Sequence, residues 1–238
     1  MNEFDGVLLI DKDSGCTSHD VVNAVRRCLK IRSVGHAGTL DPLATGLLVL
    51  LVGKATKLSQ YLMSMDKVYR GKFRLGISTN SHDSEGEVVS ESPVSDSIDA
   101  ETLRRHMASF LGDQYQTPPM FSAKKINGIP LYKLARQGQE VERQPRFINI
   151  SRFELLSYSK PDAEFELACT KGTYVRTVCN DLGARIGCGA HMMALRRMAS
   201  GKFSVDGAIT VGELGRLSPS AIKKILIPVS EAAPSFAL

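Results

Sequence analysis

An uninterrupted apolar run, Leu47–Val52, constrains the fold of this chain more than any other feature. Its six residues, Leu-Leu-Val-Leu-Leu-Val, suffice for a strand that is buried on both faces and are far too few to cross a membrane. The run directly follows a loop punctuated by glycine, residues 35–46. The sequence therefore predicts that rigid, buried structure anchors this loop.

The loop reads Gly-His-Ala-Gly-Thr-Leu-Asp-Pro-Leu-Ala-Thr-Gly, and Asp41 is its acidic residue. Glycine permits positive φ and close approach of another molecule to the backbone. Pro42 stiffens the chain just after the carboxylate. A carboxylate held in this way is preorganised, which makes Asp41 the candidate catalytic group. The alternative is a turn whose aspartate only caps a helix.

Length and composition are those of an ordinary globular protein. The chain has 238 residues, of which 43% are hydrophobic and 23% charged, enough for a substantial core. The first residues lack the basic region and apolar core of a signal peptide, and no apolar stretch reaches membrane-spanning length. We therefore expect a cytoplasmic enzyme.

Five cysteines, an odd number without a CxxC pair, favour neither a disulfide framework nor a zinc ribbon. We expect reduced, buried thiols. Cys188 and His191 could form half of a metal site, but no second pair has ligand spacing. The sequence therefore predicts no metal.

Positive charge is concentrated in one segment of the chain. The net charge is +5, and residues 117–146 contain six Lys or Arg against two Glu. Such a segment suits a polyanionic partner, although a charged surface loop is the alternative. Residues 81–101 are acidic and rich in serine, and we expect His82–Gly86 to form a solvated turn that faces away from such a partner.

Periodicity predicts strands and helices in irregular succession. Alternating or apolar patterns predict strands, and 3.6-residue spacing predicts helices. The expected strands are residues 6–11, 47–52, 68–76, 147–156 and 163–169; the expected helices are residues 17–30, 55–65, a segment around 103–111, and 175–186 with Gly187 as its stop. This mixture predicts an α+β fold with a mixed, mostly antiparallel central sheet flanked by helices.

Together with the Asp41 loop, four other segments resemble, in order, the TruB family of tRNA pseudouridine synthases. They are residues 12–18, 66–75, 116–136 and 171–197. Asp13 departs from the family, which usually has proline there, and the chain ends early at Leu238. The resemblance implies one pseudouridine synthase catalytic domain, 1–238, with an RNA-gripping insertion at about 116–146 and no C-terminal PUA domain.

The resemblance further implies isomerisation of uridine 55 in the T-loop of tRNA, after the base is flipped out. This reaction breaks the N1–C1′ bond and joins C5 to C1′, so it requires neither a redox step nor a cofactor. Asp41 matches the family's catalytic aspartate. It would act by covalent attack or by deprotonation with charge stabilisation, and the sequence does not choose between these routes.

Arg176 resembles the arginine that pairs with the catalytic aspartate of the family. A carboxylate in a pocket that excludes water needs a cation to stay ionised, and the guanidinium fork can orient it. From periodicity alone, an arginine on the exposed face of its helix is the alternative.

Four residues match the family's base-binding positions. Tyr69 would stack on the target base and assist proton transfer, while Tyr174 and Leu195 would line the uracil pocket. His36 would fill the space that the flipped base leaves. As isolated residues, the first three would be assigned to the core and His36 to a structural or solvent-facing position.

The basic insertion would hold the RNA backbone through Lys124, Lys125 and Arg136. Gly128, Pro130, Gly138 and Pro145 interrupt any long helix there, as a hinged lid requires. The expected partner is the T-arm stem-loop of tRNA, and we expect a monomer that binds no membrane. Two rival functions remain: a glycosidase, which normally needs two carboxylates, and a non-catalytic tRNA-binding chaperone.

Overall fold

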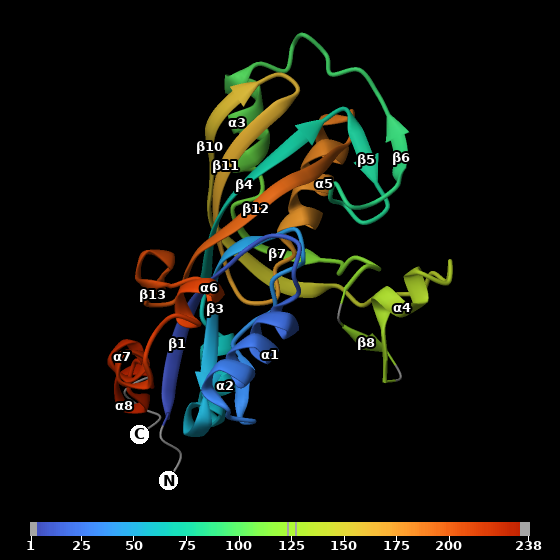
Figure 1. The fold of residues 1–238 in the computed structure, drawn as a ribbon. Helices are drawn as coiled ribbons and strands as arrows, with labels where there is room; N and C mark the ends of the chain where they lie inside the picture. The colour runs from blue at the N-terminus through green and yellow to red at the C-terminus, as the bar shows by residue number, and fades with distance from the viewer. Residues whose placement is uncertain (1–3, 123, 127, 234–238) are drawn as a thin grey trace. The chain divides into compact units, whose positions relative to one another are not determined.

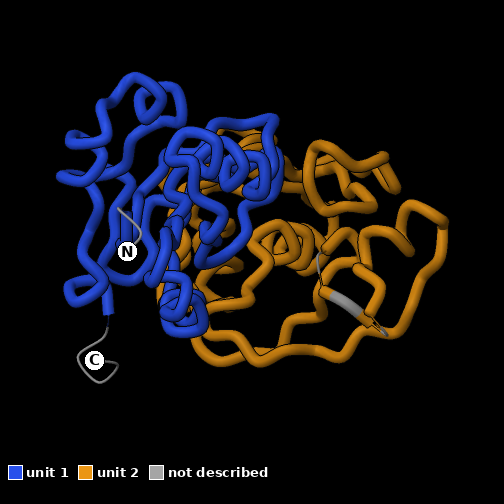
Figure 2. Tube along the Cα trace, turned by 60° about the horizontal axis from the view of Figure 1, so that its bottom comes forward, with its two compact units in different colours: residues 1–69, 195–238 blue, residues 70–194 orange. Residues whose placement is uncertain are grey.

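The structure, a computed structural model, describes residues 4–122, 124–126 and 128–233. It contains two compact units, coloured separately in Figure 2: unit 1 consists of residues 1–69 and 195–238, and unit 2 of residues 70–194. Strands β4 (Lys67–Leu75) and β12 (Ala190–Ser200) run from one unit into the other. In the described part of the chain, no helix is long and apolar enough to span a membrane.

In unit 1, the apolar run forms the middle of the sheet. β3 (Thr45–Val52) pairs antiparallel with β1 (Gly6–Lys12) and with β2 (Val34–His36), and parallel with the end of β12. The short β13 (Phe203–Ser204) continues from β12 as a hairpin. Residues 47–52 are at most 1% exposed. The prediction of a strand buried on both faces is therefore confirmed.

Helix α1 (Ser18–Leu29) covers this core with one apolar face. Thr17 caps its N-terminus and forms a capping box with Asp20, and the helix ends at Lys30 in the left-handed conformation. The helix predicted for 55–65 begins instead as a 3₁₀ turn. The remaining helical elements of the unit are η1 (Gly53–Leu58), α2 (Ser59–Met63), η2 (Val205–Gly207), α6 (Val211–Leu214), α7 (Pro219–Ile225) and α8 (Val229–Ala232).

Unit 2 is built on the strand order β12-β4-β11-β10-β7 (Figure 1). The long β10 (Arg146–Ser159) pairs antiparallel with β11 (Asp162–Cys169) on one side and with β7 (Gly112–Gln116) on the other. The ring of Phe165 packs 5.8 Å from that of Phe73 and 5.5 Å from that of Phe153, between centroids. Two small hairpins complete the strands: β5 (Ile77–Thr79) with β6 (Val88–Glu91), and β8 (Lys125–Ile126) with β9 (Ile129–Pro130).

Three helices of unit 2 accompany these strands: α3 (Ala100–Ala108), α4 (Leu131–Ala135) and α5 (Val175–Ile186). The bounds of α5 are those predicted, and Gly187 caps it with φ of 94°. Helix α3 ends before Phe110 and Leu111, which the periodicity had included. β3 pairs antiparallel with β1 and β2, as β10 does with β7 and β11, whereas β3 and β12 pair parallel. The predicted α+β class with a mixed, mostly antiparallel sheet is therefore confirmed.

The cysteine prediction is only partly correct. The five cysteines all lie in the described part of the chain and form no disulfide there; Cys169, Cys179 and Cys188 are buried, whereas Cys16 is half-buried and Cys28 is exposed. Cys28 lies on the outer side of α1, so its position in the apolar spacing of that helix was misleading.

Candidate active site

In unit 1, the loop that carries Asp41 is tied down by its backbone carbonyl groups. The Lys12 ammonium, which is fully buried, donates to the carbonyls of Ala44 at 2.7 Å and Pro42 at 3.2 Å. The Ser14 hydroxyl donates to the Leu43 carbonyl at 3.1 Å. The three residues after Asp41 are therefore fixed by side chains from the end of β1 and the turn that follows.

The other limb of the loop is held by Arg197, which is 1% exposed. Its Nε donates to the Leu47 carbonyl at 2.6 Å, and its two terminal nitrogens donate to the carbonyls of Gly38 and Thr39 at 3.2 and 3.4 Å. A buried cation is costly unless its donors find acceptors. Arg197 satisfies that demand with the loop itself, so folding this core also positions the backbone of the half-buried Asp41.

His36 is the second residue of this loop and the last residue of β2. Its Nδ1 is buried without a hydrogen-bond partner among the described residues. Burial holds the pKa of His36 below its usual range, and the positive charges of Arg197 and His19 act in the same direction. His36 is therefore neutral at pH 7, which suits insertion among bases better than contact with phosphates.

Tyr69 on β4 and Leu195 on β12 are each 8% exposed. In sequence, Tyr69 is the last residue of the first segment of unit 1, and Leu195 is the first residue of its second segment. The Leu195 carbonyl accepts a hydrogen bond from the Thr45 hydroxyl at 3.4 Å, which ties this part of β12 to the start of β3. Tyr69 points to the buried side of its strand, in agreement with the predicted alternation.

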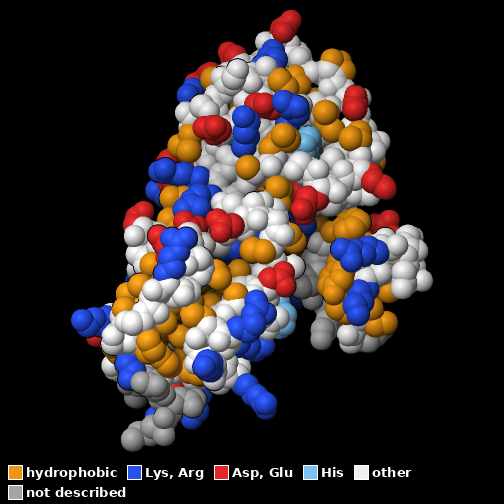
Figure 3. All heavy atoms as spheres, in the orientation of Figure 1, with side chains coloured by type: hydrophobic (Ala, Val, Ile, Leu, Met, Phe, Trp, Pro, Cys, Tyr) orange, Lys and Arg blue, Asp and Glu red, His pale blue; other side chains and the backbone are white. Residues whose placement is uncertain are grey.

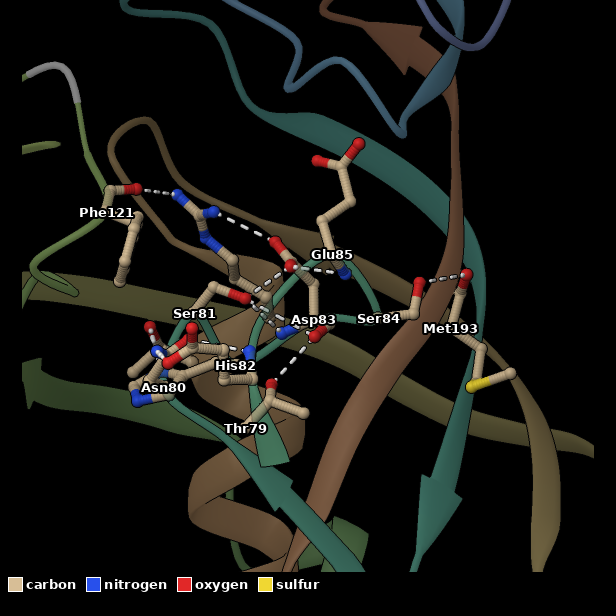
Figure 4. A network of polar contacts seen from close by, with 12 residues as sticks. Thr79, Asn80, Ser81, His82, Asp83, Ser84, Glu85, Phe121 and Met193 are labelled. Carbon is tan, nitrogen blue, oxygen red and sulfur yellow. Dashed lines mark hydrogen bonds and ion pairs between the residues drawn. The ribbon is translucent and has the colours of Figure 1, made fainter. Parts of the chain in front are cut away.

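In unit 2, Arg176 is buried in the first turn of α5, with 7% of its side chain exposed. Its guanidinium forms an ion pair of 3.0 Å with Asp83 and donates a second hydrogen bond to the Phe121 carbonyl (Figure 4). The alternative of a solvated arginine on the outer helix face is thereby excluded.

Asp83 corrects the prediction of a solvated turn at residues 82–86. It is 2% exposed, and its second carboxylate oxygen accepts from the Ser81 hydroxyl at 2.5 Å and the Glu85 amide at 3.2 Å (Figure 4). The segment is pinned to β12, because the Met192 amide donates to the His82 carbonyl and the Ser84 amide to the Met192 carbonyl. Only Ser84 and Glu85 are exposed as expected. The acidic composition of the segment wrongly predicted exposure, because Asp83 is the buried carboxylate that the buried Arg176 needs as a partner.

His82 adopts the left-handed conformation, with φ of 67°. Its Nδ1 lies 3.3 Å from the Thr177 hydroxyl. Burial lowers the pKa of His82 to about 4, and the adjacent Arg176 contributes in the same direction while Asp83 opposes it. A neutral imidazole therefore packs beside the Arg176–Asp83 pair.

Tyr174 is positioned by Gln116, a residue to which the sequence assigned no such role. The buried Gln116 amide donates to the Tyr174 carbonyl at 3.1 Å and accepts from the Tyr174 amide at 2.8 Å. The Arg176 guanidinium lies 6.0 Å from the centroid of the Tyr174 ring. The last residue of β7 thus fixes the start of α5.

The insertion contains the β8–β9 hairpin, which was not predicted, and the short helix α4. Helix α4 begins after Pro130 and ends before Gly138, in agreement with the expectation that these residues interrupt a long helix. The pKa of Lys124 is held below its usual range by desolvation and by the nearby charge of Arg146. Arg136 is exposed and lies over the Tyr132 ring at 5.6 Å. Lys125 belongs to β8, and its side chain falls outside the described residues.

The predicted site residues thus fall into two groups, each described within its own unit. Unit 1 contains His36, Asp41, Tyr69 and Leu195, and unit 2 contains Lys124, Arg136, Tyr174 and Arg176. Among the residues that the structure describes, no three His, Cys, Asp or Glu are grouped as a metal ion would require.

Sequence comparison identifies relatives over nearly the whole chain. Residues 26–175 match the N-terminal domain of the TruB family of pseudouridylate synthases, and residues 176–233 match the tRNA pseudouridylate synthase B C-terminal domain. tRNA pseudouridine synthase B of Opitutus terrae is 58% identical over 98% of this chain and 96% of its own length. The Syntrophotalea carbinolica protein of the same name is 48% identical over 96% of this chain and 74% of its own.

A crystal structure of a Cbf5-Nop10-Gar1 complex contains a chain with the same fold. It superposes with a TM-score of 0.76 at 27% identity, covering 98% of this chain and 62% of the other. The fold is therefore that of a pseudouridine synthase. Within that class, the sequence matches show that the chain belongs to the TruB family.

Proposed function

We propose that this protein isomerises uridine to pseudouridine at position 55 in the T-loop of tRNA. The observation that carries the proposal is the loop of Asp41, whose backbone is clamped by Lys12, Ser14 and Arg197 in a chain of the TruB family. The relatives named tRNA pseudouridine synthase B support the reaction and the substrate class.

In this proposal, Asp41 acts at the sugar of the target nucleotide. The N1–C1′ bond breaks, the uracil turns while it is held, and C5 bonds to C1′. C5 then loses its proton and N1 gains one, so the reaction is an isomerisation without net loss of atoms. Atoms are conserved, so no cofactor is required. Covalent attack and deprotonation at the sugar both satisfy this scheme.

Arg176 would keep Asp41 ionised and oriented. Its anchoring to Asp83 and Phe121 supports this role, because a guanidinium already fixed on two sides loses little freedom when it meets another carboxylate. If Arg176 paired with Asp83 and not with Asp41, its role would be to stabilise the fold and not to assist the reaction.

The base would be held by Tyr69, Tyr174 and Leu195, and the gap in the T-loop filled by His36. A flipped base costs a few kcal/mol of lost stacking, which an aromatic surface and a wedge offset. The neutral state of His36 and the fixed backbone of Tyr174 support these assignments.

Lys124, Lys125 and Arg136 would contact phosphates of the T-arm. Desolvation and the nearby charge of Arg146 both lower the pKa of Lys124, and a phosphate close to the two cations would favour the charged form of Lys124. We expect a monomer that acts in the cytoplasm, where its substrate would be found.

One experiment separates this function from its rivals. The protein is incubated with an unmodified tRNA transcript, and the RNA is mapped for pseudouridine and assayed for free uracil. We expect pseudouridine at position 55 and none in a control transcript with cytidine at that position. Release of free uracil would indicate a glycosidase, and unchanged RNA that is nevertheless bound would indicate a chaperone.

A further inference from the structure

A hollow lined with cations lies at the C-terminal end of α1, within unit 1. Its volume is about 430 Å³, and it is lined by Ile31 and by four basic residues, Arg26, Arg27, Lys30 and Arg32. Arg27, Lys30 and Arg32 are exposed, so their charged groups are accessible. On the face shown in Figure 3, Lys and Arg side chains recur over the part of unit 1 that contains α1 and α2.

Neighbouring acids compensate these four charges only weakly: the charge of Arg27 is the smallest of several effects that lower the pKa of the exposed Asp20. Among the described residues, none of the four forms an ion pair within 4.0 Å. The acidic residue of α1, Asp20, lies in the first turn, where it closes the capping box. The dipole of α1 favours cations at this end, but that interaction accounts for the last turn of the helix and not for Arg32.

Arg26 gives the hollow a fixed wall. Its terminal nitrogens donate to the Asn23 side chain at 3.3 Å and to the Val34 carbonyl at 2.8 Å, while its Nε is buried without a partner among the described residues. The turn after the helix is also fixed, because the Ile31 amide donates to the Arg26 carbonyl. One wall of the hollow is therefore held in place by a hydrogen bond to β2, the strand that ends at His36.

We propose that this cluster, Arg26, Arg27, Lys30 and Arg32, binds phosphates of the RNA backbone, as a contact separate from the basic insertion. The proposal rests on the proposed function, because it places the RNA at His36. Arg32 and His36 are four positions apart in the sequence, which is at most ~13 Å of extended chain. An RNA loop that reaches His36 thus passes within a few nucleotides of the cluster.

The test neutralises the three exposed cations and leaves Arg26 in place, because Arg26 also holds Val34. The variant Arg27→Gln, Lys30→Asn, Arg32→Gln uses asparagine at position 30, since asparagine tolerates the left-handed backbone there. A matched control, Lys202→Gln, Arg216→Gln, Lys224→Gln, removes three exposed cations from the C-terminal segment of the same unit. Both variants lower the net charge from +5 to +2.

Filter binding of tRNA at several salt concentrations is the readout. Affinity falls as salt rises, and each phosphate contact adds about 0.7 to 0.9 to the steepness of log affinity against log salt. If the three cations contact phosphates, the slope of the cluster variant is therefore less steep by about 2. The control variant should retain the slope of the parent protein.

The proposal is overturned if the slope of the cluster variant equals that of the control. Binding is measured without catalysis, so the two proposals can fail separately. If the parent protein forms no pseudouridine but the cluster variant has the less steep slope, only the proposed function is refuted. If the parent protein forms pseudouridine but the slope of the cluster variant is unchanged, only the proposal of a phosphate-binding cluster is refuted.

Discussion

Three buried cations lie among the residues of the candidate site, and each donates hydrogen bonds to acceptors close by. Lys12 and Arg197 donate to backbone carbonyls of the Asp41 loop, whereas Arg176 shares a carboxylate with Asp83. Burying a charge without such acceptors would cost several kcal/mol. Residues that resemble catalytic groups in the sequence are therefore supported by polar partners that no local pattern revealed.

The pKa of His82 leads to a prediction at the residue scale. The folded protein lowers this pKa from 6.5 to about 4, so the unfolded chain binds the proton first as the pH falls. The stability that neutral His82 contributes is fully present above about pH 6.5 and is lost as the pH falls toward 4. Between pH 7.5 and pH 5, the free energy of unfolding should therefore drop by up to about 2 kcal/mol on this account.

Urea denaturation of the parent and of His82→Asn at the two pH values measures this drop. Asparagine tolerates the positive φ at this position and does not titrate. The variant should lose less stability than the parent by that amount. Equal losses would mean that His82 is not the group whose titration destabilises the fold in this range.

At the scale of elements, the contact between β3 and β12 depends on Gly46. Its φ is +94°, and an added Cβ would lie 2.4 Å from the Arg197 carbonyl oxygen and 2.8 Å from the Arg197 nitrogen. Both neighbours are backbone atoms, so the strands would have to separate. We predict that Gly46→Ala destabilises the protein by about 2 kcal/mol or more, from backbone strain and steric overlap together.

Gly35→Ala is the matched control, because an added Cβ there meets no atom within 4 Å and φ is not positive. Its free energy of unfolding should stay within about 0.5 kcal/mol of the parent. Thermal or urea unfolding of both variants decides the matter. Similar stabilities for the two would show that β3 and β12 do not approach as closely as described.

The elements differ in how well the sequence predicts them. β3, β4 and β11 were predicted because apolar runs and alternation reflect burial directly, and α5 because its spacing ends at a glycine. β12 was missed, since Ala-His-Met-Met-Ala-Leu-Arg-Arg-Met-Ala-Ser is rich in good helix formers. Its strand conformation comes from pairing with distant segments, which local propensity does not encode.

At the scale of the whole molecule, the residues that the resemblance assigns to the site are divided between the two units. The resemblance to the TruB family singled out Asp41 and Arg176, although they are distant in sequence and belong to different units. Asp83, Arg197 and Gln116 were not assigned roles, because their importance arises only once their partners are buried. The RNA-gripping insertion was expected from the resemblance to the family, because its charge alone suits a surface loop equally well.

The central claim is that the carboxylate of Asp41 performs the chemistry, and Asp41→Asn tests it most directly. The substitution keeps the shape of the side chain and the carbonyl clamps of the loop, but removes the charge and the nucleophilic oxygen. Single-turnover formation of pseudouridine is measured with tRNA at saturating protein, next to tRNA binding and urea stability. We predict a folded protein that binds tRNA within about threefold of the parent, ~0.7 kcal/mol, and forms no detectable product. Product formation at an appreciable fraction of the parent rate by Asp41→Asn would contradict the account.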